Sequence, residues 1–318
     1  MAEHIVIYQI LILAILIAVG FLAVRTGLIS MNIKEGLSQL VFKLTLPLLI
    51  FTKISVLRFD KGLLLNSLWY FLLVYLAMLL MLTIAYISVR LFRFKGGETR
   101  VFMAHSLFGN IVFLGFPLMD ALFPGGKGIL YATLYHLVSS TLLWTLGVYL
   151  LSRGERLSWR ESLRKLWNPN TLAFLTGLFF AFFHIDLPEI FMDTFGKLGS
   201  TTIYLSMIYI GILLSVLTPR DFLRYPKVIL LSFNKLLLVP VFLMLIVMTL
   251  VHFFHIPLTK TAFSVLVLET AMPCMANVVI LAKEFGSDDM LAMKNVFVTT
   301  LLSIFTLPLV LWVLQTFY

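Results

Sequence analysis

Charged residues are scarce in this chain of 318 residues. Only 12% of its residues are charged, whereas 61% are apolar and the mean hydropathy is +1.03. A soluble domain carries roughly 25% charged residues, so the composition excludes a water-soluble globular protein and a disordered chain. A membrane span needs about 20 apolar residues, and this length accommodates about ten spans with their loops. We therefore predict an all-α integral membrane protein.

The sequence also has little cysteine and lacks the common enzyme motifs. Cys274 is the one cysteine, which excludes an internal disulfide and a multi-cysteine metal site. The sequence has no His-Glu-x-x-His motif, no Walker loop and no serine or cysteine with a suitable base. We therefore expect no enzyme, no metal and no cofactor.

A net charge of +9 is explained by basic cytoplasmic loops, so we expect no nucleic-acid partner. The lipid bilayer is the expected surrounding, and the sequence leaves open whether the protein forms a homodimer.

Long apolar runs, separated by charged residues, glycine or proline, give the predicted spans. Only a helix satisfies its own backbone in lipid, so each run is predicted to be a transmembrane helix. The ten runs are 5–24, 36–57, 63–91, 101–122, 128–151, 169–184, 197–217, 227–254, 260–282 and 291–316.

The longest polar stretch divides the chain into two halves. We predict a first five-helix repeat at 1–151, a basic cytoplasmic linker at 152–168 and a second five-helix repeat at 169–318. The linker is expected to form a short interfacial helix on anionic headgroups, the alternative being a regulatory or partner-binding segment. Because an odd number of spans gives the halves opposite orientations, they are predicted to be inverted repeats.

Basic residues predict the orientation. Sixteen Lys and Arg residues lie in loops after odd-numbered spans, and five lie in loops after even-numbered spans. Basic loops stay in the cytoplasm. We therefore expect a multi-pass protein of the inner (plasma) membrane with both termini outside the cytoplasm.

Three spans contain helix breakers, and two of these spans hold the same position in their halves. A broken helix frees backbone groups that survive in a membrane only where protein or water meets them. A mere kink is the alternative, but breaks in the fourth span of each half favour a binding site. The breakers are Pro47 in span two; Gly109, Gly115 and Pro117 in span four; and Pro273 in span nine.

Polar and small residues adjoin the breaks in spans four and nine. Asn110 and Asn277 offer amide donors and acceptors, and Cys274 is expected to be a small lining residue. With Gly109 and Pro273 they form the predicted substrate site. Half-helix N-termini directed at the membrane centre would favour a carboxylate or another ion there.

Ionisable residues inside the spans are candidates for coupling or for attracting an anion. Burying a charge at the bilayer centre costs at least about 2.5–3.5 kcal/mol. Glu269, the deepest acid, either couples transport to an ion or pairs with a buried group, and His136 has the same two alternatives. Lys43 and Lys235 either line an anion path or extend to the membrane surface, as Lys53 is expected to do. The coupling ion stays open between a proton and sodium.

Several short motifs together resemble the auxin efflux carrier family, and the resemblance spans nearly the whole chain. They lie at 46–51, 109–118, 168–169, 271–273, 280–286 and 303–309. The resemblance implies ten spans in two inverted repeats, with crossed, broken helices four and nine and the substrate site beside the crossing. Family members export auxin in plants, and prokaryotic relatives are described as malate or malonate permeases.

By match of motif, Asn110 corresponds to the family's substrate-contacting asparagine and Pro273 to its crossover proline. The chain departs from the plant carriers in two of these motifs. Gly109 stands where they have a proline before the asparagine, and Val278 stands where a second proline of span nine is expected. Span three also lacks their Asp/Lys pair, so no role is carried over for that pair.

The sequence thus predicts a secondary carrier for a small organic anion, such as a dicarboxylate or an auxin-like acid. Alternating access would proceed by an elevator or rocking motion. A ligand-sensing membrane receptor, or a channel or uniporter without coupling, is the alternative.

Overall fold

A computed structural model describes residues 2–152, 158–215 and 225–317 of the chain. Over these residues the regular elements are helices, without a strand. The prediction of an all-α protein is therefore confirmed. Residues 153–157 of the predicted linker lie outside the described residues, and its remainder contains a short helix, α9 (Trp159–Leu166).

The helices include short π-helical segments, which are labelled η. In chain order the remaining elements are α1 (Ala2–Arg25), α2 (Ile33–Leu40), η1 (Val41–Thr45), α3 (Leu46–Ser55), α4 (Lys61–Leu91), α5 (Gly96–Leu107), η2 (Ile111–Gly115), α6 (Phe116–Leu122), α7 (Lys127–Leu142), η3 (Leu143–Gly147), α8 (Val148–Leu151), α10 (Pro169–Phe183), α11 (Glu189–Leu214), α12 (Pro226–Phe233), η5 (Asn234–Leu238), α13 (Val239–Phe254), α14 (Lys260–Thr270), α15 (Asn277–Glu284) and α16 (Asp289–Phe317).

Six of these helical stretches are long and apolar enough to cross a membrane. They are Ile33–Ser55, Lys61–Leu91, Lys127–Leu151, Glu189–Leu214, Pro226–Phe254 and Asp289–Thr316. Leu11–Arg25, Ile111–Leu122 and Pro169–Phe183 are shorter apolar helices. A multi-pass membrane protein follows from the six helices, whereas ten spans in inverted repeats stay a prediction.

The chain folds into two compact units, and each takes helices from both halves of the sequence. The first unit comprises Met1–Ser67, Val112–Leu134 and Trp167–Leu217, and the second comprises Leu68–Ile111, Tyr135–Leu166 and Thr218–Tyr318. Sequence halves and compact units are therefore different divisions of this chain.

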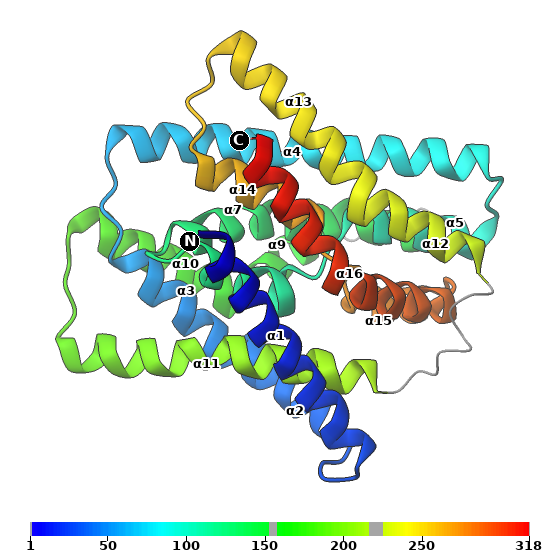
Figure 1. The fold of residues 1–318 in the computed structure, drawn as a ribbon, viewed down its shortest axis with the longest axis horizontal. Coiled ribbons are helices and arrows are strands. Elements are labelled where there is room, and N and C mark those ends of the chain that lie inside the picture. Colours follow the sequence, from blue (N-terminus) through cyan, green and yellow to red (C-terminus); the bar gives the residue numbers. More distant parts are fainter. Residues whose placement is uncertain (1, 153–157, 216–224, 318) are drawn as a thin grey trace. The chain divides into compact units, whose positions relative to one another are not determined.

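In the first unit, α1 packs against α11, and α3 packs against both α10 and α11 (Figure 1). Glycines allow the closest approach. A Cβ on Gly20 would overlap the backbone of Ile208, and a Cβ on Gly211 would overlap the carbonyl oxygen of Ile17. The backbones of α1 and α11 are thus in contact, as in small-residue packing of membrane helices.

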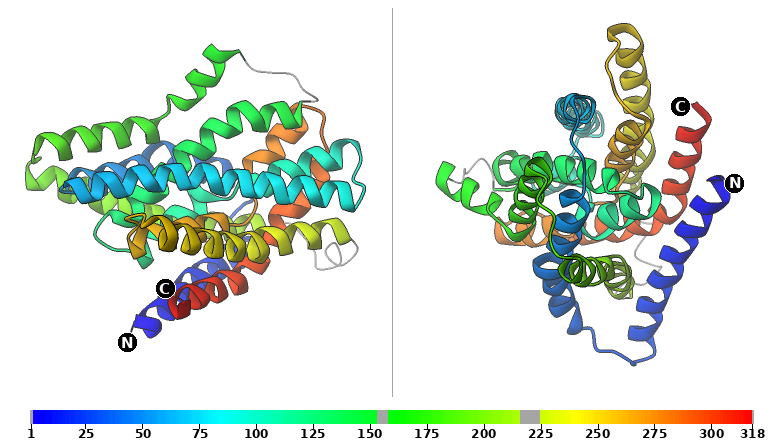
Figure 2. Two further views of the ribbon diagram at one scale, coloured as in Figure 1. Left: turned by 90° about the horizontal axis from the view of Figure 1, so that it is seen from above. Right: turned by 90° about the vertical axis from the view of Figure 1, so that its left-hand side faces the viewer.

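In the second unit, α13 and α14 run side by side (Figure 2). The helix pair α15 and α16 follows, and α16 also contacts α5, α12 and α14. The buried residues around these contacts are mostly apolar, but they include His105, Lys235, Glu269 and Asn295. Ionisable groups in a membrane helix are expected to face the protein interior, and three of these four are ionisable.

Prolines follow three of the π-helical segments, which corrects part of the sequence prediction. Pro47, Pro117 and Pro240 each occupy the first turn of the helix that comes directly after η1, η2 or η5. A proline ring clashes with the carbonyl four residues earlier, and a π turn relieves that clash by adding a residue. The helix of span two therefore continues through Pro47, with a wider π turn just before the proline. Gly115 and Pro117 likewise lie within continuous helix, after the actual interruption of span four.

Candidate functional site

Two helix interruptions meet inside the second unit. The first follows α5, where Phe108 is extended (φ −96°, ψ 115°). The second separates α14, which ends at Thr270, from α15, which begins at Asn277. Gly109 and Cys274 face each other across them as an isolated antiparallel bridge. The structure thus brings together Gly109 and Cys274, two of the predicted site residues of spans four and nine.

Backbone hydrogen bonds join the two interruptions. The amide of Asn110 donates to the carbonyl of Pro273 at 2.7 Å, and the amide of Met275 donates to the carbonyl of Phe108 at 3.1 Å. Pro273 has no amide hydrogen and therefore cannot continue the α14 ladder. Each interruption supplies partners to the other, which satisfies the requirement that buried backbone groups be paired.

The two segments approach closely at Gly109. A Cβ there would lie 3.1 Å from Cβ of Met272 and 3.4 Å from its carbonyl oxygen. Contacts this short are tighter than most Cβ contacts, so a side chain would require Met272 to shift slightly. The close approach therefore favours glycine at residue 109.

Lys235 donates a hydrogen bond to a backbone carbonyl that has lost its helical partner at the interruption. In an uninterrupted helix the Ser106 carbonyl would accept the Asn110 amide four residues on. That amide is bonded to Pro273, and Nζ of Lys235 donates to the Ser106 carbonyl instead, at 3.1 Å. The buried amine therefore lies at the carboxyl end of α5, the end where a helix favours cations.

Side chains from α16 and α5 hold the second interruption. The amide of Cys274 donates to Oγ1 of Thr299 at 3.0 Å. Nε2 of His105 lies 3.2 Å from the Met275 carbonyl, and Nδ1 lies 3.2 Å from Nδ2 of Asn295. A carbonyl accepts only, so Nε2 carries the proton and Nδ1 accepts from the amide.

The remaining predicted residues differ in their surroundings. Asn110 is buried, whereas Asn277, the first residue of α15, is exposed. Glu269 is buried in the last turn of α14, and neither of its carboxyl oxygens has a hydrogen-bonding partner among the described residues. His136, on α7, is buried, and its Nε2 lies 3.3 Å from Oγ of Ser140.

Two of the lysines considered from the sequence belong to the first unit, whereas the interruptions belong to the second. Lys43 is exposed on η1. Lys53 forms an ion pair with Asp120 of α6 at 2.9 Å, and the carboxylate is buried. The expectation that Lys53 merely extends to the membrane surface is therefore wrong. Sequence reasoning could not find Asp120 as the partner because 67 positions separate the two residues.

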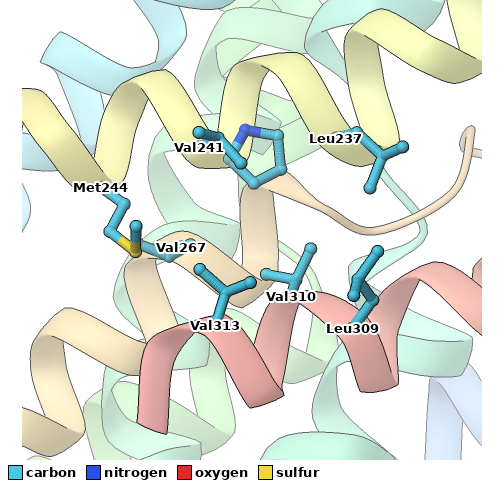
Figure 3. A pocket seen from close by; sticks show the side chains of 8 residues that line it. Leu237, Val241, Met244, Val267, Leu309, Val310 and Val313 are labelled. Carbon is cyan, nitrogen blue, oxygen red and sulfur yellow. The ribbon is translucent and has the colours of Figure 1, made fainter. Parts of the chain in front are cut away.

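An apolar pocket of about 100 Å³ lies elsewhere in the second unit, between η5, α13, α14 and α16. Its walls are Leu237, Pro240, Val241, Met244, Val267, Leu309, Val310 and Val313 (Figure 3). None of these side chains has a polar group that could bind a carboxylate. The helix interruptions therefore remain the candidate substrate site.

The sequence is similar to known proteins, and this similarity shows the family to which the chain belongs. The sequence profile of the family described as membrane transport protein matches residues 5–311, nearly the whole chain. The chain belongs to the membrane transport protein family. This family includes the auxin efflux carriers, so the resemblance stated from the motifs is confirmed.

Archaeal relatives of this membrane transport protein cover almost the same length. An uncharacterized transporter of Methanothermobacter thermautotrophicus is 29% identical over 300 residues, which are 93% of this chain and 94% of the relative. An uncharacterized transporter of Methanocaldococcus jannaschii is 23% identical over 316 residues, 96% of this chain and 97% of the relative. Membrane transport is thus the function common to the family and these relatives.

Three residues that support the interruptions of this membrane transport protein were not predicted as site residues: His105, Asn295 and Thr299. A signal was present on α16, where Asn295 and Thr299 are four residues apart and so lie on one helix face. The backbone acceptor of His105 could not be predicted, because Met275 comes close only when both helices break.

Proposed function

We propose that this membrane transport protein is a secondary active carrier for a small organic anion, and that the anion carries a carboxylate. The observation that supports this most strongly is the meeting of two helix interruptions beside a buried lysine. Irregular backbone inside a membrane protein is typical of transporter substrate sites. The proposed architecture is ten helices in two inverted five-helix repeats, in which broken helices four and nine cross.

The proposed substrate site is made of the interruptions themselves. Asn110 would contact the substrate through its side-chain amide, while its backbone amide stays bonded to Pro273. Gly109 and Cys274 would form the wall where the two segments pair. Asn277 at the start of α15 would meet the substrate from the exposed side, near a helix end that favours anions.

Glu269 is the proposed coupling residue. A buried carboxylate without hydrogen bonds is unfavourable, so the carboxyl group is suited to hold a proton in one state and release it in another. Sodium is the alternative coupling ion. Substrate access would alternate by an elevator or rocking motion of one helix bundle, with the protein in the plasma membrane and its termini outside the cytoplasm.

Gradient-driven uptake tests this proposal. Proteoliposomes would receive labelled malate, malonate or indole-3-acetate, with proton, sodium and voltage gradients imposed separately. We expect one carboxylate to accumulate above its external concentration under one gradient. Equilibration without accumulation would indicate a channel or uniporter, and binding without flux would indicate a receptor.

A further inference from the structure

Lys235 is a buried cation without a carboxylate partner. Its side chain is 2% exposed, and its Nζ donates one hydrogen bond, to the Ser106 carbonyl. An ammonium group has three donors. Lys227 of this unit forms an ion pair with Glu98, whereas no carboxylate oxygen among the described residues lies within 4.0 Å of Lys235. A buried charge normally has a paired counter-charge.

The position of this amine is fixed by its own helix. The preceding residue, Asn234, donates from Nδ2 to Oγ of Ser88 on α4 at 2.8 Å, which anchors η5. Pro240, in the first turn of α13, follows the π turn that contains Lys235. The amine therefore lies at the end of α5, on the carbonyl of Ser106, which is four residues before Asn110.

We propose that the carboxylate of the substrate is the missing counter-charge, and that Lys235 binds it directly through the two donors that Ser106 leaves over. This inference rests on the proposed function, because it assigns one residue to the anionic group of that substrate. Asn110 would then hydrogen-bond the substrate from the neighbouring interruption. Selectivity for an acid over its amide would depend on Lys235.

Ligand-induced thermal stabilisation of the purified full-length protein in detergent tests this assignment. The probes are malonate, malate and indole-3-acetate, with malonamide as the uncharged analogue. A ligand that binds the folded state raises the unfolding temperature, so we expect at least one carboxylate to do so and malonamide not to. In Lys235→Gln the apparent affinity for that carboxylate should fall by about tenfold to a hundredfold, because a charge-assisted hydrogen bond is lost.

Two further variants make the result specific. Lys235→Arg keeps the charge and should retain part of the affinity. Lys283→Gln removes the same charge from an exposed position of α15 and should bind like the wild type. Equal carboxylate affinity in Lys235→Gln and wild type would overturn the assignment while leaving the proposed function intact. Failure of every carboxylate to stabilise the wild type would instead overturn the proposed function, and this inference with it.

Discussion

At the scale of single residues, the proposed role of the buried acid Glu269 can be tested directly. Its carboxyl group has no hydrogen-bonding partner among the described residues, although Glu269 lies in the last turn of α14, directly before the interruption. An ionisable residue that is buried inside a membrane helix without a partner indicates a functional role rather than a structural one. The proposed role is to bind and release the coupling proton.

We predict that Glu269→Gln abolishes accumulation driven by a proton gradient but leaves exchange of labelled for unlabelled substrate. Glutamine has the shape of the protonated acid and cannot release a proton. Both rates would be measured in proteoliposomes under the same substrate concentrations. Equal loss of uptake and exchange would show that Glu269 has a structural role.

Thr299 gives a second residue-scale prediction. Its hydroxyl oxygen accepts the Cys274 amide at 3.0 Å, and its hydrogen is donated to the Asn295 carbonyl at 2.6 Å. Thr299→Val leaves the Cys274 amide buried without a partner, which should lower the free energy of unfolding by about 1–3 kcal/mol. Denaturant unfolding in detergent would measure this, and Thr299→Ser, which keeps the hydroxyl group, should retain most of the stability. A fully stable valine variant would contradict the hydrogen-bond assignment.

The site could be predicted in part from the residues, and the reason is physical. Glycine, proline and asparagine in the middle of an apolar run indicate where a helix ladder fails, so the interruptions at Gly109, Asn110 and Pro273 could be predicted, and the structure shows them. Which distant groups then satisfy the freed backbone is a tertiary property. The roles of Ser106 and Thr299 therefore required the structure.

At the scale of elements, helix breakers show the limits of sequence patterns. Pro47 and Pro117 have the same chemistry as Pro273, yet the chain stays helical through both by forming a π turn. Pro273 follows the end of α14, and its carbonyl is bonded to another segment. A proline interrupts the helix where a neighbouring segment offers hydrogen-bonding partners to the freed backbone. Whether such a segment lies nearby cannot be predicted from composition.

Packing of α1 on α11 gives the element-scale prediction. Gly211→Ala places a methyl group against the Ile17 carbonyl, and the resulting overlap should cost about 1–3 kcal/mol of stability. Gly196 is the matched control on the same helix, because a Cβ there meets no atom within 4 Å. Gly196→Ala should be neutral or slightly stabilising, since alanine favours helix.

Thermal unfolding of both glycine variants in the same detergent compares them directly. Similar unfolding temperatures for Gly211→Ala and Gly196→Ala would contradict the close contact of α1 and α11 in the first unit.

At the scale of the whole molecule, composition was sufficient for the class but not for the architecture. A charged fraction of 12% indicates a membrane protein regardless of order along the chain, and six long apolar helices agree. The compact units each combine segments from both sequence halves. That arrangement depends on which helix faces pack, and apolar runs of similar composition cannot specify it.

Membrane transport of a carboxylate is the central claim of the proposed function, and Asn110 is the residue by which to test it. Asn110→Ala removes the side-chain amide but keeps the backbone amide that donates to Pro273, so the interruptions should persist.

The most direct measurement is concentration-dependent uptake of labelled malonate, malate or indole-3-acetate by wild-type and Asn110→Ala proteoliposomes. We predict saturable, gradient-driven uptake of one carboxylate by the wild type. In Asn110→Ala, shown to be folded, we predict an apparent affinity weaker by about tenfold, since a hydrogen bond left unmade in a buried site costs about 1–3 kcal/mol. An unchanged apparent affinity would contradict the assignment of the helix interruptions as the substrate site.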